Sequence, residues 1–309
     1  MSADPSQEID SNMDASASND KSPALRYRGR FAPSPSGPLH FGSLVAAVGS
    51  YLQARRHGGS WQVRIEDIDP PRVVVGAAED QLATLARFGL RPDGPVQYQR
   101  RFTPRHAAAV ERLLDQGLAF PCGCSRSDLP ASGVYPGTCR DGLPPGRASR
   151  SIRFRVPAAA VRVEDPLRGA WEERLEERCG DVVIRRADGH YAYQLAVVVD
   201  DLYEGITEVV RGADLIDSAA RQQALHQAFG RTAPRWLHLP LVVDSSGRKL
   251  SKSSGADPVA ARPAADALAL ALRVLGQPPP PGLQSLDTLW SWAHAHWDPT
   301  RIPTDPFEI

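Results

Sequence analysis

The stretch RFAPSPSGPLHFGS, residues 30–43, decides the predicted fold of this chain. Residues 26–32 suit a short strand, and the Pro-rich turn after them leads into small and apolar residues at helical spacing over 39–56. A helix N-terminus offers unpaired N–H groups and the positive end of the helix dipole, which attract phosphate. Gly42 allows a nucleotide to approach closely, and His40 can donate to a phosphate oxygen. The stretch therefore predicts a nucleotide site; a capped helix with a packing glycine is the alternative.

The alternation of strand and helix continues downstream and predicts an α/β fold. A second strand is expected at 61–65 and a second helix at 79–88, an order typical of a parallel sheet with right-handed crossovers. Residues 193–201, YQLAVVVDD, are largely apolar and predict a buried central strand. Further elements are expected as a helix at 218–229, a strand at 238–243, and helices at 257–275 and 284–296.

The composition is that of an ordinary globular protein. The chain has 309 residues, of which 42% are hydrophobic, and it contains no apolar run long enough to span a membrane. Residues 1–25 are rich in Ser, Asp and Asn and predict a disordered acidic tail without the apolar stretch of a signal peptide. The net charge is zero, but without this tail 35 bases face 31 acids, which suits contact with a polyanion.

Lysine is rare in this chain and gathers at one place. Of the 36 Lys and Arg residues only three are Lys, and two of those, Lys249 and Lys252, lie in the segment KLSKS at 249–253. Lys is a compact charge on a flexible stem, whereas Arg is a planar fork. The pair indicates a loop that grips phosphate oxygens, and chance retention of two lysines is the alternative.

Three bunched cysteines predict a metal site in an inserted module at 121–187. The three are Cys122, Cys124 and Cys139. The chain shows no export signal, which favours metal over disulfides, and thiolates suit Zn²⁺, which takes four tetrahedral ligands in structural sites. Asp128 and Asp141 are chemically plausible fourth ligands, and three reduced, buried thiols are the alternative. Cys179 is expected to be a core residue.

Five arginines lie close to these cysteines, with Gly and Pro between them. A basic, flexible strip suits an RNA backbone, and a solvated surface is the alternative. The five are Arg140, Arg147, Arg150, Arg153 and Arg155. The last segment holds three tryptophans, which we expect to be core aromatics of the C-terminal helices rather than a platform for bases. They are Trp290, Trp292 and Trp297.

Two of these segments together resemble the HIGH and KMSKS signatures of class I aminoacyl-tRNA synthetases. They are HFGS at 40–43 and KLSKS at 249–253, and the flanking stretches RIEDID at 64–69 and VRGAD at 210–214 resemble the glutamyl branch. The resemblance covers about residues 26–256 and implies a Rossmann-like catalytic domain with a zinc-bearing insertion and a short helical C-terminal extension. The implied divisions are the tail 1–25, catalytic halves 26–120 and 188–256, the insertion 121–187, and the extension 257–309.

Two departures from the usual pattern resemble the truncated glutamyl-Q tRNA(Asp) synthetase family. Only about fifty residues follow KLSKS, and the fourth position of HFGS is Ser43 rather than His. The resemblance implies activation of L-glutamate with ATP and Mg²⁺, without tRNA for this step, and transfer to the cyclopentenediol of queuosine at the wobble position of tRNA(Asp). It also implies one structural Zn²⁺ with Tyr135 as fourth ligand beside the three cysteines.

The chemistry of glutamate suggests the residue roles. Arg30 and Arg211 can each hold a carboxylate by a bidentate fork, Glu66 can face the ammonium, and Tyr193 offers a hydroxyl. In the family, the amino-acid pocket is lined by positions that match Arg30, Ala32, Ser34, Glu66, Tyr193 and Arg211. ATP is expected against His40, Gly42, Ser43 and Lys252, and the catalytic groups are expected to be His40, Lys249 and Lys252. Lys252 would neutralise the triphosphate while the α-phosphorus is attacked.

Three other functions remain open at this point. An ordinary glutamyl-tRNA synthetase would charge a tRNA 3′ end, and a catalytically silent paralogue would only bind tRNA. A nucleotidylyltransferase shares a His-x-Gly turn but has no use for a glutamate pocket. The expected protein is a cytoplasmic monomer without membrane contact.

Overall fold

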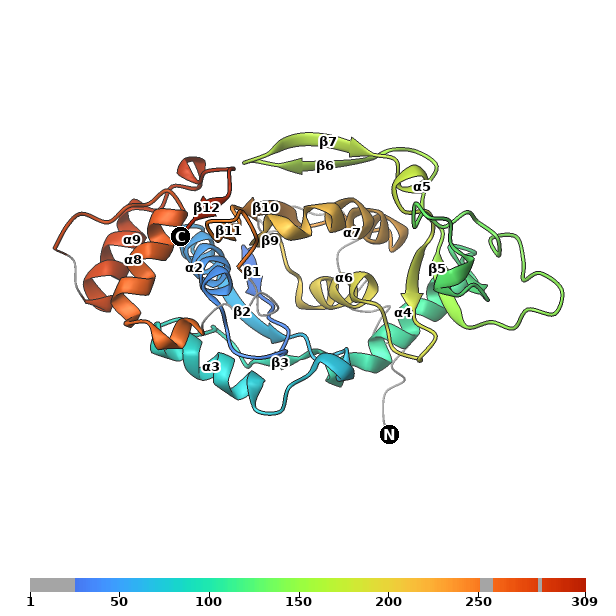
Figure 1. Cartoon of the computed structure of the whole chain (residues 1–309), viewed down its shortest axis with the longest axis horizontal. Coiled ribbons are helices and arrows are strands. Elements are labelled where there is room, and N and C mark those ends of the chain that lie inside the picture. Colours follow the sequence, from blue (N-terminus) through green and yellow to red (C-terminus); the bar gives the residue numbers. More distant parts are fainter. Residues whose placement is uncertain (1–25, 251–257, 283–284) are drawn as a thin grey trace.

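The computed structural model describes residues 26–250, 258–282 and 285–309 (Figure 1). The expected acidic tail at 1–25 lies outside these ranges, and so does Lys252. Figure 1 shows an elongated molecule with α8 and α9 at one end and the strand β5 at the other. None of the helices in the described part combines the length and apolar character that crossing a bilayer requires.

Two short parallel sheets form the centre, as the alternation of strand and helix predicted. The first sheet has the order β1–β2–β3, and the second pairs β9 with β10. These strands are β1 (Arg28–Phe31), β2 (Ser60–Ile65), β3 (Gln97–Tyr98), β9 (Glu208–Gly212) and β10 (Arg235–Leu239). The backbone N–H of Thr207 donates to the carbonyl oxygen of Arg28 at 2.9 Å, and so β9 begins beside β1. The mixed α/β class of the prediction is therefore confirmed.

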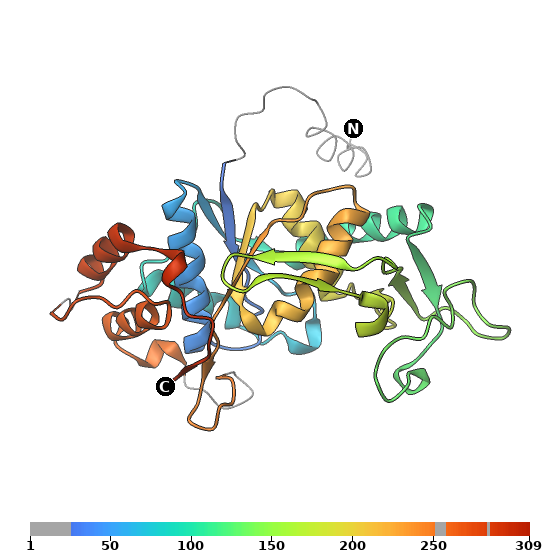
Figure 2. The same ribbon diagram turned by 90° about the horizontal axis from the view of Figure 1, so that it is seen from above.

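Helices cover this central layer. The helix α2 is buried along most of its length, because it lies between β1 and the C-terminal helices α8 and α9 (Figure 2). Its central residues Leu44 and Val48 are fully buried in the main core. The helices before the insertion are α2 (Phe41–Arg56), α3 (Ala77–Arg87) and α4 (Thr103–Asp115), and those after it are α6 (Tyr193–Glu204) and α7 (Ile216–Ala228).

The prediction of a strand at 193–201 is wrong, because these residues begin the helix α6. Every residue from Leu195 to Asp201 is buried, and a helix that is covered on all sides shows no polar stripe from which to read a helical period. Gly205 ends the helix in the left-handed region, at φ 62°. A glycine stop after a run of this length is the signal that favours a helix.

The insertion contains two antiparallel sheets and one short helix. One sheet has the order β4–β5–β8, and the other is the hairpin β6–β7, which lies along α7 (Figures 1 and 2). The elements are β4 (Ala119–Cys122), β5 (Ser151–Phe154), β6 (Val161–Asp165), β7 (Gly169–Glu173), α5 (Leu175–Arg178) and β8 (Val182–Arg185). Apolar side chains of β5, β6 and β8 share a second core with α4, α6 and α7, and so the insertion packs tightly on the catalytic half that follows it.

The C-terminal extension packs on α2 through the helices α8 (Ala264–Val274) and α9 (Leu286–His296). The helix α8 begins seven residues later than predicted, because Pro263 precedes it and residues 259–261 form a 3₁₀ turn. Trp297 is buried and donates from Nε1 to Gln53 Oε1 at 3.0 Å. Trp290 and Trp292 are half-buried and pack against the same core, as expected.

The last strand of the catalytic half is interrupted. The predicted strand at 238–243 is split into the end of β10 and β11 (Val242–Val243), because Pro240 lacks a backbone donor. On one side β11 pairs in parallel with β12 (Phe307–Glu308), and on the other Val243 bridges Lys249. The C-terminal strand, which the sequence did not predict, therefore supports the strand that leads to the KLSKS segment.

Candidate active site

One cavity of about 700 Å³ opens at the carboxyl ends of β1 and β9 and the N-terminus of α2. Such a position is where open parallel sheets bind their ligands. Ten predicted site residues line this cavity, and they come from segments far apart in the chain. They are Arg30, Ala32, Ser34, His40, Gly42, Ser43, Glu66, Tyr193, Arg211 and Lys249. Of the residues predicted to bind glutamate or ATP or to act in catalysis, only Lys252 is missing from this set, because it lies outside the described residues.

The N-terminus of α2 forms one end of the cavity. His40 is the N-cap residue, and its Nδ1 accepts from the backbone N–H of Ser43 at 3.3 Å. A Cβ atom on Gly42 would come within 3.1 Å of the His40 ring, so that glycine fits closely under the imidazole. Backbone donors and the dipole at a helix N-terminus make this end of the cavity electropositive, an environment that suits phosphate.

The described residues on either side of the stretch 251–257 lie beside this turn. A Cβ atom on Gly42 would lie 3.9 Å from the carbonyl oxygen of Leu250. On the other side of the undescribed residues, Pro258 forms a β-bridge with His40. Lys249 Nζ lies 2.5 Å from Asp214 Oδ2 and faces the same cavity. The HFGS turn and the described start of KLSKS, which lie about 200 residues apart in the sequence, are therefore neighbours in the structure.

A buried charge network supports the other end of the cavity. Arg30 donates to both carboxylate oxygens of Asp201, from Nε at 3.1 Å and from a terminal nitrogen at 3.2 Å. Arg64 donates to the same carboxylate at 2.7 Å, to Glu66 at 3.3 Å and to Glu204 at 2.8 Å. Although burial opposes ionisation, Arg30 and Arg64 lower the pKa of Asp201 from 3.8 to about 2. The Asp201 carboxylate is therefore fixed as an anion.

Glu66 and Tyr193 face the cavity from β2 and α6. Burial raises the pKa of Glu66, with Arg64 and Arg30 opposing it. Burial, followed by the nearby Glu66, raises the pKa of the Tyr193 phenol, which stays a neutral donor at pH 7. A carboxylate beside a neutral hydroxyl suits a ligand that carries an ammonium group. An adjoining cavity of about 280 Å³ shares Ser34, Glu66 and Tyr193 with the main one.

Arg211, at the far side of the cavity, is held by acceptors from three directions. Its Nε lies 3.1 Å from His238 Nε2, and its terminal nitrogens donate to Gln222 Oε1 at 2.7 Å and to the Leu215 carbonyl oxygen at 3.1 Å. The guanidinium also lies over the Trp236 ring, 4.9 Å from its centroid. Its orientation is therefore set before any ligand binds.

Sequence reasoning missed the partners that hold these arginines. Asp201 closes the stretch YQLAVVVDD, which was noted without assigning that residue a role, whereas Gln222 and His238 belong to no noted motif. The acids that close the run VVVDD were a usable signal, because charged residues at the end of a buried run need partners. Gln222 and His238 carried no comparable signal.

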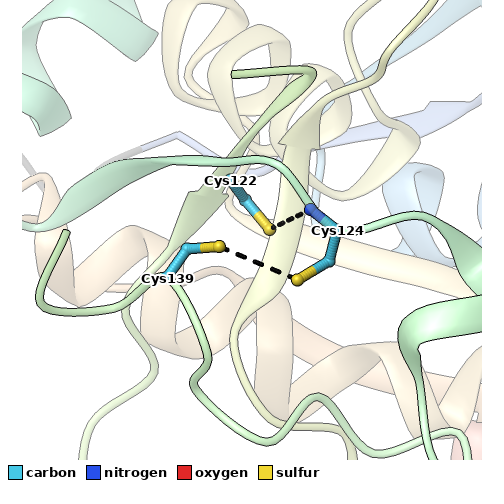
Figure 3. A group of neighbouring side chains, drawn as sticks. All are labelled: Cys122, Cys124 and Cys139. Carbon is cyan, nitrogen blue, oxygen red and sulfur yellow. Dashed lines mark hydrogen bonds between the residues drawn. The ribbon is translucent and has the colours of Figure 1, made fainter. Parts of the chain in front are cut away.

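The three cysteines predicted as metal ligands form a separate buried cluster in the insertion (Figure 3), and Tyr135 packs with them. The sulfurs of Cys122, Cys124 and Cys139 all lie within 4.8 Å of one another, and those of Cys124 and Cys139 are 3.7 Å apart. A tetrahedral zinc with Zn–S bonds of about 2.3 Å would separate its sulfurs by about 3.8 Å. The Tyr135 hydroxyl oxygen lies 3.5 Å from the Cys122 sulfur. The donor set therefore fits a metal ion.

Two neighbouring features support this cluster. Although burial opposes it, hydrogen bonds from Tyr135, Cys124 and Arg153 lower the pKa of the Cys122 thiol to about 7. Gly180 has φ +66°, and a Cβ atom there would meet the Tyr135 carbonyl oxygen at 2.2 Å, so that only glycine allows this approach. The neighbouring Cys179 is half-buried against the second core and stands apart from the cluster, as expected.

The five arginines interpreted as an RNA-binding strip also make contacts within the insertion, and one of them, Arg153, is too buried to contact RNA. Arg153 is buried, donates to the Cys122 sulfur at 3.3 Å and lies 3.8 Å from the centroid of the Tyr135 ring. Arg147 donates to the Cys124 sulfur at 3.3 Å. Arg140 pairs with Glu176 and Asp181, and Arg155 lies over the Phe120 ring. These four stabilise the module, and Arg150 alone of the five is exposed.

Comparison with known proteins agrees with this geometry. The chain matches the family model described as tRNA synthetases class I (E and Q), catalytic domain, over residues 26–132 and 145–265. The fold and the cavity thus define a class I tRNA synthetase catalytic domain, and the protein is a ligase. Among solved structures, a glutamate tRNA ligase from Elizabethkingia meningosepticum, in complex with its amino acid, superposes with a TM-score of 0.78 at 25% identity, covering 92% of this chain and 67% of that one.

Similar sequences narrow the assignment. A protein of Chromobacterium violaceum is 49% identical over 290 residues, which cover 92% of this chain and 97% of the relative. A protein of Pseudomonas aeruginosa is 52% identical over 280 residues, which cover 90% of this chain and 95% of the relative. Both are named glutamyl-Q tRNA(Asp) synthetase. The chain belongs to the glutamyl-Q tRNA(Asp) synthetase family, and the resemblance seen in its motifs is confirmed.

We expect Asp201→Asn to lower the free energy of unfolding by about 3–5 kcal/mol, because it leaves two buried guanidinium groups without their shared counter-charge. The folded-state pKa lies below the unfolded value of 3.8, so that Asp201 stabilises the fold above pH 3.8 and its contribution fades as pH falls toward 2. The variant should therefore lose less stability than the wild type over that acid range. Urea unfolding between pH 7 and pH 2 measures both effects.

The matched control is Asp217→Asn, which removes the carboxylate from an exposed pair with Arg178 at 3.2 Å. An exposed pair contributes at most about 1 kcal/mol. Similar losses in the two variants at pH 7 would contradict the role given to Asp201.

Proposed function

We propose that this protein activates L-glutamate with ATP and transfers the glutamyl group to the queuosine cyclopentenediol at the wobble position of tRNA(Asp). The observation that carries the proposal is the single cavity in which Arg30, Glu66, Tyr193 and Arg211 face the same space as His40 and Lys249. One set suits a ligand with two carboxylates and an ammonium, and the other suits a triphosphate.

In the first step, a glutamate carboxylate oxygen attacks the α-phosphorus of ATP, and pyrophosphate leaves. The protein supplies positioning and charge rather than acid–base chemistry. Arg211 and Arg30 hold the amino acid, and the turn at His40 and Gly42 holds phosphate. Lys249 and Lys252 neutralise charge that shifts toward the leaving pyrophosphate. Mg²⁺ would bind the ATP phosphates, because this ion prefers oxygen ligands.

In the second step, a hydroxyl oxygen of the acceptor diol attacks the activated carbonyl carbon, an ester forms, and AMP leaves. The adjoining cavity supports this step because it touches the glutamate pocket through Glu66 and Tyr193, and its lining also includes Asp69 and Arg186. Relatives near 50% identity carry the glutamyl-Q name, which favours this acceptor over a tRNA 3′ end. We further propose a cytoplasmic monomer, with domain divisions as predicted from the sequence.

We also propose that the cysteine cluster holds one structural Zn²⁺ through Cys122, Cys124, Cys139 and Tyr135. Four protein ligands would leave the ion no open position for a reaction. The ion would instead tie the loop at 123–139 to the end of β4, where Cys122 lies, and so fix the shape of the insertion.

Glutamate-dependent ATP–pyrophosphate exchange without tRNA tests the first step. We expect Lys252→Ala to lower the exchange rate by about 10²–10³, because it removes a charge that acts mainly in the transition state. Arg273→Ala, an exposed charge on α8, is the control and should match the wild type. Exchange by Lys252→Ala close to the wild-type rate would refute the role given to Lys252. Exchange without added glutamate would contradict the proposal that glutamate is the substrate.

The site of the label identifies the acceptor. We expect labelled glutamate to enter tRNA(Asp) that carries queuosine but not queuosine-free tRNA(Asp), and periodate oxidation of the diol to abolish the transfer. Nuclease digestion at mildly acidic pH, which preserves esters, followed by nucleoside chromatography should find the label on queuosine. Label on the terminal adenosine of unmodified tRNA(Glu) would show an ordinary glutamyl-tRNA synthetase instead.

Zinc content tests the metal proposal. We expect about one zinc per purified wild-type chain by elemental mass spectrometry, and Cys139→Ser to lose the metal and melt at a lower temperature, because structural zinc contributes folding free energy. Cys179→Ser, which changes a cysteine outside the cluster, is the matched control and should keep its zinc. A wild-type protein purified without zinc that also takes up none on addition would contradict the proposal.

A further inference from the structure

Three side chains form a buried line that ends at the cavity. Asp165 Oδ2 lies 2.8 Å from His238 Nδ1, and His238 Nε2 lies 3.1 Å from Arg211 Nε. The side chains of His238 and Asp165 are fully buried, and Arg211 is 6% exposed. Asp165 ends β6 in the insertion, His238 belongs to β10, and Arg211 belongs to β9. The line therefore runs from the inserted hairpin to the wall of the cavity.

Chemistry fixes the direction of both hydrogen bonds. A guanidinium carries only donors, so that His238 Nε2 must accept the Arg211 Nε–H with its lone pair. The imidazole proton then resides on Nδ1 and is donated to the Asp165 carboxylate, which carries only acceptors when ionised. The other tautomer would place a ring N–H against the arginine Nε–H. The carboxylate thus selects the imidazole tautomer that can hold the arginine.

The support from His238 differs from that of the other hydrogen-bond anchors of Arg211, because it acts on Nε rather than on a terminal nitrogen. Gln222 and the Leu215 carbonyl oxygen each bind a terminal nitrogen. His238 binds Nε and so fixes rotation of the guanidinium plane. These contacts occupy three of the five guanidinium N–H donors, and two remain for a ligand. A planar fork grips a carboxylate only when its plane is correctly aimed.

We infer that His238 and Asp165 are positioning residues, which aim the Arg211 guanidinium at a carboxylate of the amino-acid substrate. The inference rests on the proposed function, since it assigns Arg211 to that carboxylate. It also gives the hairpin β6–β7 a role beyond packing, because its Asp165 acts on the cavity through a residue of β10.

A packing role for His238 is the competing explanation, because its ring lies between Trp171 and Trp236, each 6.4 Å away by centroid distance. Two variants separate the explanations. His238→Gln offers an amide oxygen near the position of Nε2 and can still accept from Arg211. His238→Asn is shorter, so it retains a donor for Asp165 but does not reach the arginine. Both replace the ring with an amide and disturb the packing.

The experiment measures KM for glutamate and for ATP in pyrophosphate exchange. We expect His238→Asn to raise KM for glutamate by about tenfold or more, the effect of losing one hydrogen bond to a charged group, with KM for ATP unchanged. We expect His238→Gln to recover most of that loss. Equal effects of the two variants, or an equal rise in both KM values, would overturn the inference in favour of packing.

Nitrogen NMR of histidine-labelled wild-type protein gives a second readout that needs no activity. We expect His238, assigned by its loss in His238→Gln, to be neutral with its proton on Nδ1. A proton on Nε2 would overturn the inference even if neither variant kept enough activity for exchange to be measured. Wild-type protein without glutamate-dependent exchange would refute the proposed function itself, whereas wild-type exchange with an unaltered His238→Asn would refute this inference alone.

Discussion

The structure depends most on the Asp201 carboxylate, which two buried arginines share. Arg30 lies on β1, Arg64 on β2 and Asp201 on α6, so that one anion joins both halves of the catalytic domain. A charge taken out of water is costly unless it is paired and hydrogen-bonded. Here each charge receives at least two such bonds. Any arrangement that separated the two halves would take Asp201 from both arginines and leave Arg64 with Glu66 alone.

The same interaction prepares the cavity for an anionic ligand. Some of the guanidinium N–H donors of Arg30 are already bonded to Asp201. Some of those of Arg211 are already bonded to Gln222 and His238. Arginine loses much rotational freedom when it binds, and a side chain that is already held loses less. A cavity of this kind favours ligands whose carboxylates match fixed positions, and it therefore gains selectivity as well as affinity.

Local pattern was enough to predict the parts of the site that lie within one motif. The turn at His40 and Gly42 follows from proline, glycine and helix capping, and the three clustered cysteines follow from their spacing. The partners of Arg30 and Arg211 could not be predicted in this way. Asp201 is 171 residues from Arg30, and His238 is 27 residues from Arg211 on a different strand. Tertiary packing decides such pairs, and burial also concealed the helical period of α6.

The arginines of the insertion show why a basic stretch is ambiguous in sequence. Three thiolates around Zn²⁺ would leave a net negative charge in a buried cluster, and burial makes such a charge costly. Arg153 and Arg147 place guanidinium groups 3.3 Å from two of the sulfurs and would balance that charge. Guanidinium suits this position because it is weakly hydrated and can stack on Tyr135, as Arg153 does. Two of the five positive charges that suggested an RNA surface are therefore directed toward the thiols they stabilise.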